Sequence, residues 1–552
     1  MGQPWRLWLF QGRRKLARFS GSIWFLPSLM TALAVALFIL SSAADHALGI
    51  SVPPSEQFVQ ILLFAGGPSA ARSVLSAIST AWAAILGVVF SVTLVTVQLT
   101  STMYTAQLLS EFEKSRLNQG TLGAFVGTVV YALLVLKTVR TGEEGAEPFV
   151  PVVGTNLAIV FAVVSLFLLV LFLANVISFV RPRRFVDSTA RTTVTAARTL
   201  LAPQERPDVE VPRRDERAPR PEEGVHPSPI LSDETPLRRW SVRSREDGFV
   251  SGIEWVHLLT AIEAAMRAWW QRQASDAPRR GLTWTVHLEK TIGDRVARGE
   301  TLAVLETSLA EHDLQTLDTW VRLAYEVESE RRPEGDPAYG IAILGAMGEK
   351  AAAGMDSEVV VEVLAGLYAV LAGVAPAPEP APSLIVPVDG RRVTIERPVT
   401  YLFQATLSAV DRVVDAALRA HLRVVPHAVA RNTTDLLLRT YREGALHAAR
   451  RLSDALLPLA TRAFTRIEPP EAAAPVVDEL ANLVEHLAVQ RLDDEAGLVV
   501  ESLDKLHQTA RSSPPRDDIV HQRLARLLQS PPVQQRPTIH ARLGEIVRHG
   551  RG

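Results

Sequence analysis

A row of hydroxyl-bearing residues follows one face of the second long apolar segment of the sequence. With residues placed 100° apart, as in an α-helix, Thr93, Thr96, Thr100, Tyr104 and Gln107 fall within an arc of about 80°. Uncharged polar groups of this kind can line water or form hydrogen bonds to neighbouring helices inside a membrane. The row therefore predicts either a water-lined surface or a set of interhelical hydrogen bonds.

Toward the N-terminus the same face is apolar, because Trp82, Leu86 and Val89 continue the row there. A ring of such side chains can close a narrow pore by excluding water. Under this interpretation the segment lines an oligomeric channel, and its pore-lining candidates are Trp82, Leu86, Val89, Thr93, Thr96, Thr100 and Tyr104. Under the alternative interpretation the face only packs against other helices.

Three residues are candidates for helix packing. Gly123 and Gly127 lie on one helical face and permit close helix approach in lipid, and Asn175 suits an interhelical hydrogen bond. The long apolar segments contain no ionisable residue of the kind that proton- or sodium-coupled carriers keep at mid-membrane. A coupled carrier is therefore not expected.

Catalytic motifs are absent from the sequence. Cysteine does not occur, Glu485-His486 lacks the second histidine of a zinc-protease motif, and Glu311-His312-Asp313 is typical of a solvated helix start. Neither a Walker phosphate loop nor a nucleophile elbow is present. We therefore expect no enzyme activity, no metal ion and no cofactor.

One stretch, "IGDRVARGETLAVLE", is similar to the closing half of a biotinyl or lipoyl carrier barrel. Such a carrier needs a lysine on the hairpin shortly after Glu306, where this chain has Thr307, Ser308 and Leu309. The stretch is therefore expected to be a structural β-turn module.

Four uncharged runs surround these residues and must position them. They cover residues 19–44, 73–110, 117–136 and 148–180, with lengths of 26, 38, 20 and 33 residues. A helix of roughly 20 residues crosses the hydrocarbon core of a bilayer. The runs predict a four-helix transmembrane bundle over residues 1–185.

The basic residues predict the orientation of this bundle. Those that flank its two ends are Arg6, Arg13, Arg14, Lys15, Arg18, Arg181, Arg183 and Arg184. The positive-inside rule then places both termini in the cytoplasm. The net charge of -1 gives no indication of a nucleic-acid partner.

The remaining chain is charged and divides into three parts. Residues 186–237 are expected to form a juxtamembrane helix and a proline-rich flexible linker (203–229), and residues 238–308 a small α+β module. Residues 309–552 are expected to be mostly helical, with a helix around 309–330, two helices in 400–455, one β-hairpin at Asp389-Gly390 and no evident internal repeat. The predicted fold is therefore mainly α.

The order of these features resembles a family of bacterial predicted membrane proteins called domain of unknown function twenty-two fifty-four. The stretches that carry the resemblance include "GSIWFLPSLMTALAVAL", "LGAFVGTVVYALLVLKTVR" and "DGFVSGIEW". The resemblance implies the architecture and a bacterial inner membrane. Two functions stay open: a homo-oligomeric channel-like protein with a cytoplasmic regulatory domain, or a membrane-anchored sensor or scaffold whose cytoplasmic helices bind a protein partner.

Overall fold

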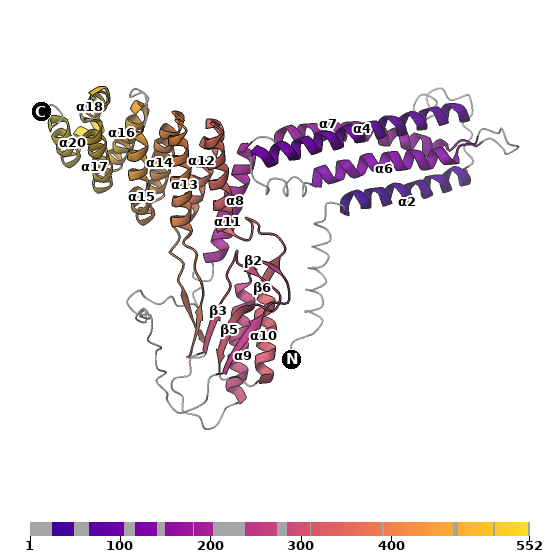
Figure 1. Cartoon of the computed structure of the whole chain (residues 1–552), viewed down its shortest axis with the longest axis horizontal. Coiled ribbons are helices and arrows are strands. Elements are labelled where there is room, and N and C mark those ends of the chain that lie inside the picture. Colours follow the sequence, from indigo (N-terminus) through magenta and orange to yellow (C-terminus); the bar gives the residue numbers. More distant parts are fainter. Residues whose placement is uncertain are drawn as a thin grey trace. The chain divides into compact units, whose positions relative to one another are not determined.

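The computed structural model describes most of the chain in two compact units, Met1–Phe185 and Val186–Gly552 (Figure 1). The described residues are 25–48, 66–103, 116–140, 149–179, 182–201, 238–272, 284–307, 309, 311–388, 391–466, 473–511 and 514–549. The expected linker 203–229, Tyr104 and Gln107 lie outside them, as do the side chains of Thr96 and Thr100.

The first unit contains four apolar helices, one in each predicted run. They are α2 (Phe25–Leu48), α4 (Pro68–Met103), α6 (Arg116–Thr138) and α7 (Val152–Phe179). All four are long and apolar enough to cross a membrane, which confirms the predicted multi-pass architecture. Half of the most apolar window of α6 is buried, against 17% for the other three helices. The α6 helix therefore forms the centre of the bundle, and the other three expose apolar surface that suits lipid.

The second unit combines two small sheets with helices, as the predicted α+β module requires. Its first elements are α8 (Pro182–Leu201), β1 (Arg238–Arg243), β2 (Gly248–Ile253), α9 (Trp255–Arg272), β3 (Trp284–Leu288), β4 (Arg295–Val296), β5 (Thr301–Thr307), α10 (Glu311–Ala324) and β6 (Tyr325–Glu328). One sheet has the order β1-β5-β3-β8-β7 and the other has the order β4-β2-β6.

The expected hairpin completes the larger sheet. Its strands, β7 (Ser383–Val388) and β8 (Arg391–Glu396), pair with each other, and β8 also runs parallel to β3 with Val286 opposite Ile395. The sheet module therefore includes residues far beyond the expected limit at residue 308. This parallel pairing joins segments about 100 residues apart, which local sequence patterns do not reveal.

A strand also replaces the end of an expected helix. The helix predicted around residues 309–330 ends at Ala324, and β6 follows it directly. Tyr325 pairs with Ile253 of β2, and its hydroxyl donates to the carbonyl of Leu302 at 3.1 Å. Tertiary pairing thus overrides the local helical pattern at this point.

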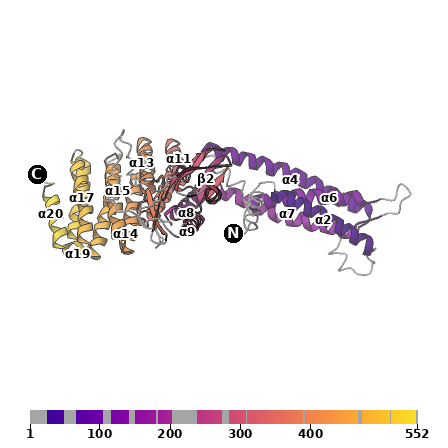
Figure 2. The ribbon, with the colours of Figure 1, turned by 90° about the horizontal axis from the view of Figure 1, so that it is seen from below.

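The rest of the unit is a stack of antiparallel helices (Figure 2). They are α11 (Pro337–Ala353), α12 (Ser357–Val374), α13 (Leu402–Arg419), α14 (Val424–Arg442), α15 (Leu446–Thr465), α16 (Ala474–Val489), α17 (Asp493–Ala510), α18 (Pro514–Gln529), α19 (Pro531–Gln534) and α20 (Pro537–His549). Helices α11, α13, α15 and α17 follow one another in one layer, and α12, α14 and α16 follow one another in the other.

Four turns of this stack share one backbone geometry. Their left-handed residues are Met355, His421, Gly444 and Arg491, with φ between 55° and 74°. In each turn the next N–H donates to the carbonyl five residues earlier, as in Leu422 to Ala417 at 3.0 Å and Leu492 to Leu487 at 3.0 Å. This is the Schellman cap, and it makes the helical hairpin a repeated unit that no sequence pattern indicated.

Helix α12 is a fifth helix whose length and composition would allow a membrane span. However, protein covers it within the second unit. A Cβ on Gly373 would lie 2.6 Å from a methyl group of Val194 in α8, and the Tyr368 hydroxyl lies 2.9 Å from that of Thr433 in α14. The apolar character of α12 thus reflects its position in a protein core.

Candidate functional site

The apolar part of the predicted pore face lies inside the four-helix bundle of a single chain. Trp82 is only 4% exposed, and its ring stacks on Phe125 of α6 with centroids 5.2 Å apart. Val89 is 3% exposed and belongs to the same buried cluster as Phe172 of α7. Leu86 packs against the edge of this cluster. The face is covered by α6 and α7 in the described chain.

In the polar part of the face, the structure describes the side chain of Thr93, and its hydroxyl forms a hydrogen bond within its own helix. The Thr93 hydroxyl donates to the carbonyl of Val89 at 2.7 Å, within its own helix. Elsewhere on α4, Val88, Phe90 and Leu94 are exposed and suit contact with lipid. The pore-lining role of the row stays a prediction, and the geometry within one chain is that of a packed face.

The two glycines of α6 face α2 and allow close contact there. A Cβ on Gly123 would lie 2.9 Å from Cα of Pro27 and 3.0 Å from Cβ of Met30. A Cβ on Gly127 would lie 3.5 Å from that of Ala34, which is an ordinary contact distance. The bundle therefore needs a glycine at residue 123 much more than at residue 127.

Uncharged hydrogen bonds join the helices at several levels. Asn175 Nδ2 donates to Asn118 Oδ1 at 2.8 Å, and the hydroxyls of Thr128 and Ser165 lie 2.8 Å apart. The Tyr131 hydroxyl donates to Ser41 Oγ at 2.9 Å. These pairs are the interhelical bonds that polar residues form in membranes.

Asp45 is a site residue that sequence reasoning missed. It is 6% exposed and accepts hydrogen bonds from the N–H groups of Val153 at 2.8 Å and Gly154 at 3.0 Å. These groups belong to the first turn of α7, which begins directly after Pro151. Pro151, the residue before α7, has no side-chain acceptor and cannot cap the helix itself. Asp45 of α2 supplies the cap from another helix instead.

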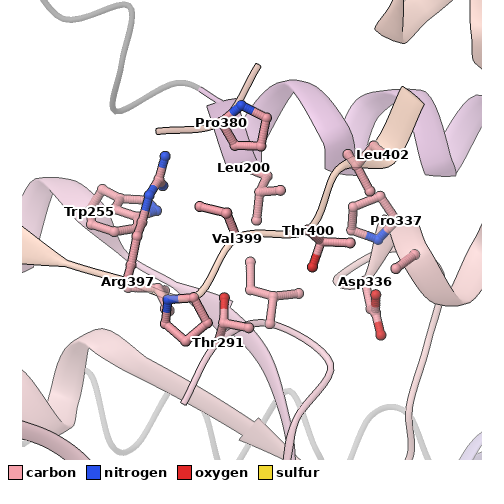
Figure 3. A pocket seen from close by; sticks show the side chains of 14 residues that line it. Leu200, Trp255, Thr291, Asp336, Pro337, Pro380, Arg397, Val399, Thr400 and Leu402 are labelled. Atoms are coloured by element: carbon pink, nitrogen blue, oxygen red, sulfur yellow. The ribbon is translucent and has the colours of Figure 1, made fainter. Parts of the chain in front are cut away.

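A small pocket in the second unit surrounds Arg397, at the end of β8 (Figure 3). Arg397 is 8% exposed, its Nε donates to the carbonyl of Ala381 at 3.1 Å, and its guanidinium lies 5.2 Å from the centre of the Trp255 ring. Burial lowers the pKa of Arg397 to about 10, so the group stays charged at neutral pH. The buried indole N–H of Trp255 has no hydrogen-bond partner among the described residues.

Asp336 lies on the opposite side of this pocket (Figure 3). It is 2% exposed, forms an ion pair with Arg331 and caps α11 by accepting from the N–H of Tyr339 at 3.0 Å. The free volume of the pocket, about 20 Å³, holds at most one water molecule. The pocket is therefore a joint between chain segments with little free space, lined mostly by apolar residues.

The carrier-like stretch is a pair of tight turns. Gly293 and Gly299 have φ of 92° and 87°, which only glycine adopts without strain. Glu306, beyond the second turn, contacts His287 of β3 at 3.4 Å. The neighbouring Lys290 forms an ion pair with Glu300. The side chains of this stretch thus have structural roles in the turns and ion pairs described above.

The histidine motifs also have structural partners. His486 Nδ1 lies 2.8 Å from the carbonyl of Asn482, one turn earlier, and Glu311-His312-Asp313 forms the first turn of α10. Within the described ranges, no group of three or more histidine, cysteine, aspartate or glutamate side chains is arranged to hold a metal ion.

The chain is similar to a family of predicted membrane proteins and to several uncharacterised proteins. Residues 20–269 match the family described as "Predicted membrane protein (DUF2254)", which confirms the resemblance seen in the sequence. Uncharacterised proteins of Mycobacterium bovis and of two strains of Mycobacterium tuberculosis are each 29% identical over 177 residues. The match spans 32% of this chain and 32% of each relative, about a third of their length.

A solved structure also aligns with the chain. It is a "Circular tandem repeat protein with novel repeat topology and enhanced subunit contact surfaces", with 11% sequence identity and 96% of each chain covered. The TM-score of 0.29 is too low to establish a shared fold.

Proposed function

We propose that this chain, whose residues 20–269 match the DUF2254 family of predicted membrane proteins, is a membrane-anchored scaffold or sensor without enzyme activity. In this proposal the helical stack binds a protein partner in the cytoplasm. The observation that carries the proposal is the stack of antiparallel hairpins from α11 to α20. Stacks of repeated hairpins present long continuous surfaces, and such surfaces are typically used for binding.

Exposed apolar residues at the turns of the stack support this role. Met355 is 72% exposed, Val424 is 54% exposed and Val489 is 66% exposed. Each lies at or beside a turn between consecutive helices.

The packing of α4 supports an anchoring role for the bundle. An oligomeric channel lined by this helix would need Trp82, Leu86 and Val89 to face a central axis. In the single chain this face instead packs against α6 and α7. A channel is thus the second hypothesis, and it requires the bundle to repack on self-association.

Two measurements on the full chain test the proposal. Purified protein in planar bilayers should show no single-channel conductance. A photo-crosslinking residue placed at Met355, Val424 or Val489 in living cells should give a discrete adduct of constant added mass. The control position is Val256 on α9, which is 63% exposed outside the stack. Conductance that changes in Trp82→Ala, together with no adduct at the stack positions, would establish the channel hypothesis instead.

A further inference from the structure

Helix α8 runs beside α12 and in the same direction. Val186 of α8 packs against Gly366 of α12, and further along Val194 packs against Gly373. Since residue numbers rise together in the two helices, the beginning of α8 points to the same end of the stack as the beginning of α12. The chain therefore enters the second unit toward the end of the stack where the turn between α11 and α12 lies.

This end of the stack is joined to the last apolar helix by a short length of chain. Helix α7 ends at Phe179, and Val186 follows seven residues later. Seven residues span at most about 25 Å even when fully extended. Helix α12 begins at Ser357, nine residues before Gly366, which is about 14 Å along the helix axis toward this end. The turn before α12 is therefore within reach of the lipid surface at the end of α7.

The turn after α13 lies at the same end of the stack, because α11 and α13 run parallel. A Cβ on Gly345 of α11 would lie 3.3 Å from that of Ala409 of α13. One turn later, a Cβ on Gly348 would lie 2.7 Å from a methyl group of Val413. Each of the two helices ends in one of the left-handed turns described above. Two turns therefore present their side chains at this end.

These two turns carry exposed basic and apolar side chains, which we call the basic end. The basic end consists of Met355, Arg419, His421, Arg423 and Val424, all of which are exposed. The apolar members are Met355, at 72% exposure, and Val424, at 54%. Exposed apolar groups together with positive charge are the composition that binds an anionic lipid surface.

The positive charge of the basic end is available to a ligand. Residues 416–434 contain no aspartate or glutamate. Within the described part of the chain, Arg419 and Arg423 have no ion-pair partner. In the other turn, Asp356 and Glu358 complement the N-terminus of α12, where Asp356 is the N-cap. The charges of the two arginines are thus not neutralised by the described protein.

The opposite end of the stack differs in charge. Its turn between α14 and α15 pairs Glu443 with Arg439 at 3.0 Å. Its turn between α16 and α17 places Asp493 and Asp494 shortly after the exposed Val489. Exposed apolar residues thus occur at both ends, whereas the arginines without an acidic partner in the described turns lie at the basic end. This difference favours lipid at the basic end.

We propose that the basic end binds the anionic surface of the bilayer that the chain spans. The side chains of Met355 and Val424 enter the boundary between headgroups and acyl chains, and the guanidinium groups of Arg419 and Arg423 bind lipid phosphates. This contact leaves the opposite end, with Val489, for a protein partner. The inference goes beyond the proposed scaffold function and does not depend on it.

Fluorescent labels on the full chain test this contact in vesicles of phosphatidylcholine and phosphatidylglycerol in equal parts. The chain has no cysteine, so Met355→Cys, Val424→Cys and Val489→Cys each provide a single labelling site. Spin-labelled lipid in the vesicles should quench the first two labels strongly and the third weakly. Vesicles of phosphatidylcholine alone should quench the first two labels less. The spin label occupies both leaflets, so the result does not depend on the direction of insertion.

Removing the charges should detach the basic end from the vesicle. Arg419→Gln with Arg423→Gln should lower the ratio of bound to free basic ends about thirtyfold, since each basic residue near an anionic surface contributes roughly fivefold. The matched control, Arg439→Gln with Arg442→Gln, removes two arginines from the opposite end and should leave quenching unchanged. High salt should weaken quenching in the chain with its natural arginines. Thermal unfolding reports whether each variant is folded.

The outcomes separate this contact from the scaffold function. Equal or weak quenching of all three labels, or quenching that neither salt nor loss of the two arginines reduces, would overturn the proposed contact. A discrete protein adduct at Met355 or Val424 in living cells would also overturn it and assign the basic end to a protein partner. The expected quenching without any adduct at Val489 would support the lipid contact and contradict the scaffold function.

Discussion

Trp82 of α4 and Phe125 of α6 stack inside the membrane bundle, with ring centroids 5.2 Å apart and ring planes inclined by 28°. Both side chains are almost fully buried, at 4% and 0% exposure. The contact ties the apolar part of the predicted pore face to the central helix of the bundle. The stability lost when this contact is removed distinguishes a packed face from a water-lined one.

Trp82→Ala should destabilise the bundle by about 3 kcal/mol, because it removes this stacking and leaves a cavity beside Phe125. Thermal unfolding of the purified chain in detergent measures the change. Phe90→Ala is the control, since Phe90 lies on the same helix and is 51% exposed. Equal effects of the two substitutions would contradict burial of Trp82 in the bundle.

Gly123→Ala should destabilise the contact between α2 and α6, whereas Gly127→Ala should be nearly neutral. The added Cβ would lie 2.9 Å from the backbone of Pro27 in the first case and 3.5 Å from Ala34 in the second. Unfolding in detergent compares the two variants directly. Gly87→Ala is a further control, because no atom lies within 4 Å of its added Cβ. A neutral Gly123→Ala would show that the helices approach less closely.

Asp45→Ala should cost about 1 kcal/mol, since it removes the cap from the first turn of α7. Asp45→Asn should retain part of this stability, because an amide oxygen still accepts one of the two hydrogen bonds. Thermal unfolding again provides the measurement. Ser76→Ala, at an exposed position of α4, serves as the control. An unchanged unfolding temperature for Asp45→Ala would rule out the cap.

Mild acid should loosen the end of the helical stack through His507 of α17. His507 is 1% exposed, and burial lowers its pKa although Asp517 of α18, at 3.2 Å, opposes this shift. Below about pH 6.5 the unfolded chain therefore takes up a proton before the folded chain does, and stability falls as the pH decreases. Arg511 and His521 act in the same direction as burial, and Asp504 acts with Asp517.

His507→Gln should remove this part of the pH dependence. Hydrogen exchange of α17 and α18 between about pH 7 and pH 5 measures it, across the usual range of histidine titration. The exposed His447, substituted in the same way, is the control. Equal pH dependence in wild type and His507→Gln would assign the effect to other groups.

The membrane part of the fold was predictable because its signal is local. An uncharged run of about 20 or more residues is sufficient to indicate a span. In contrast, the sequence pattern of residues 400–455 predicts two helices, yet α13, α14 and half of α15 occupy them. The turns between them use His421 and Gly444 as left-handed residues, and only the glycine is a usual signal of a helix end.

The residues of the sites were harder to predict, because long-range contacts define them. Asp45 caps a helix that begins more than 100 residues later, and Arg397 meets Trp255 across the sheet module. The helical spacing of its residues identifies the face of α4 in the sequence. That spacing does not reveal whether the face contacts water or packs against α6 and α7.

The parallel pairing of β3 with β8 has a consequence for the synthesis of the chain. Strand β3 ends at Leu288, and β8 begins at Arg391, roughly 100 residues later. At about 5–20 residues per second, the ribosome needs on the order of 5–20 s to add the second strand. During that interval the edge of β3 that later binds β8 lacks its partner, so a chaperone that shields strand edges should associate with the nascent chain at this stage.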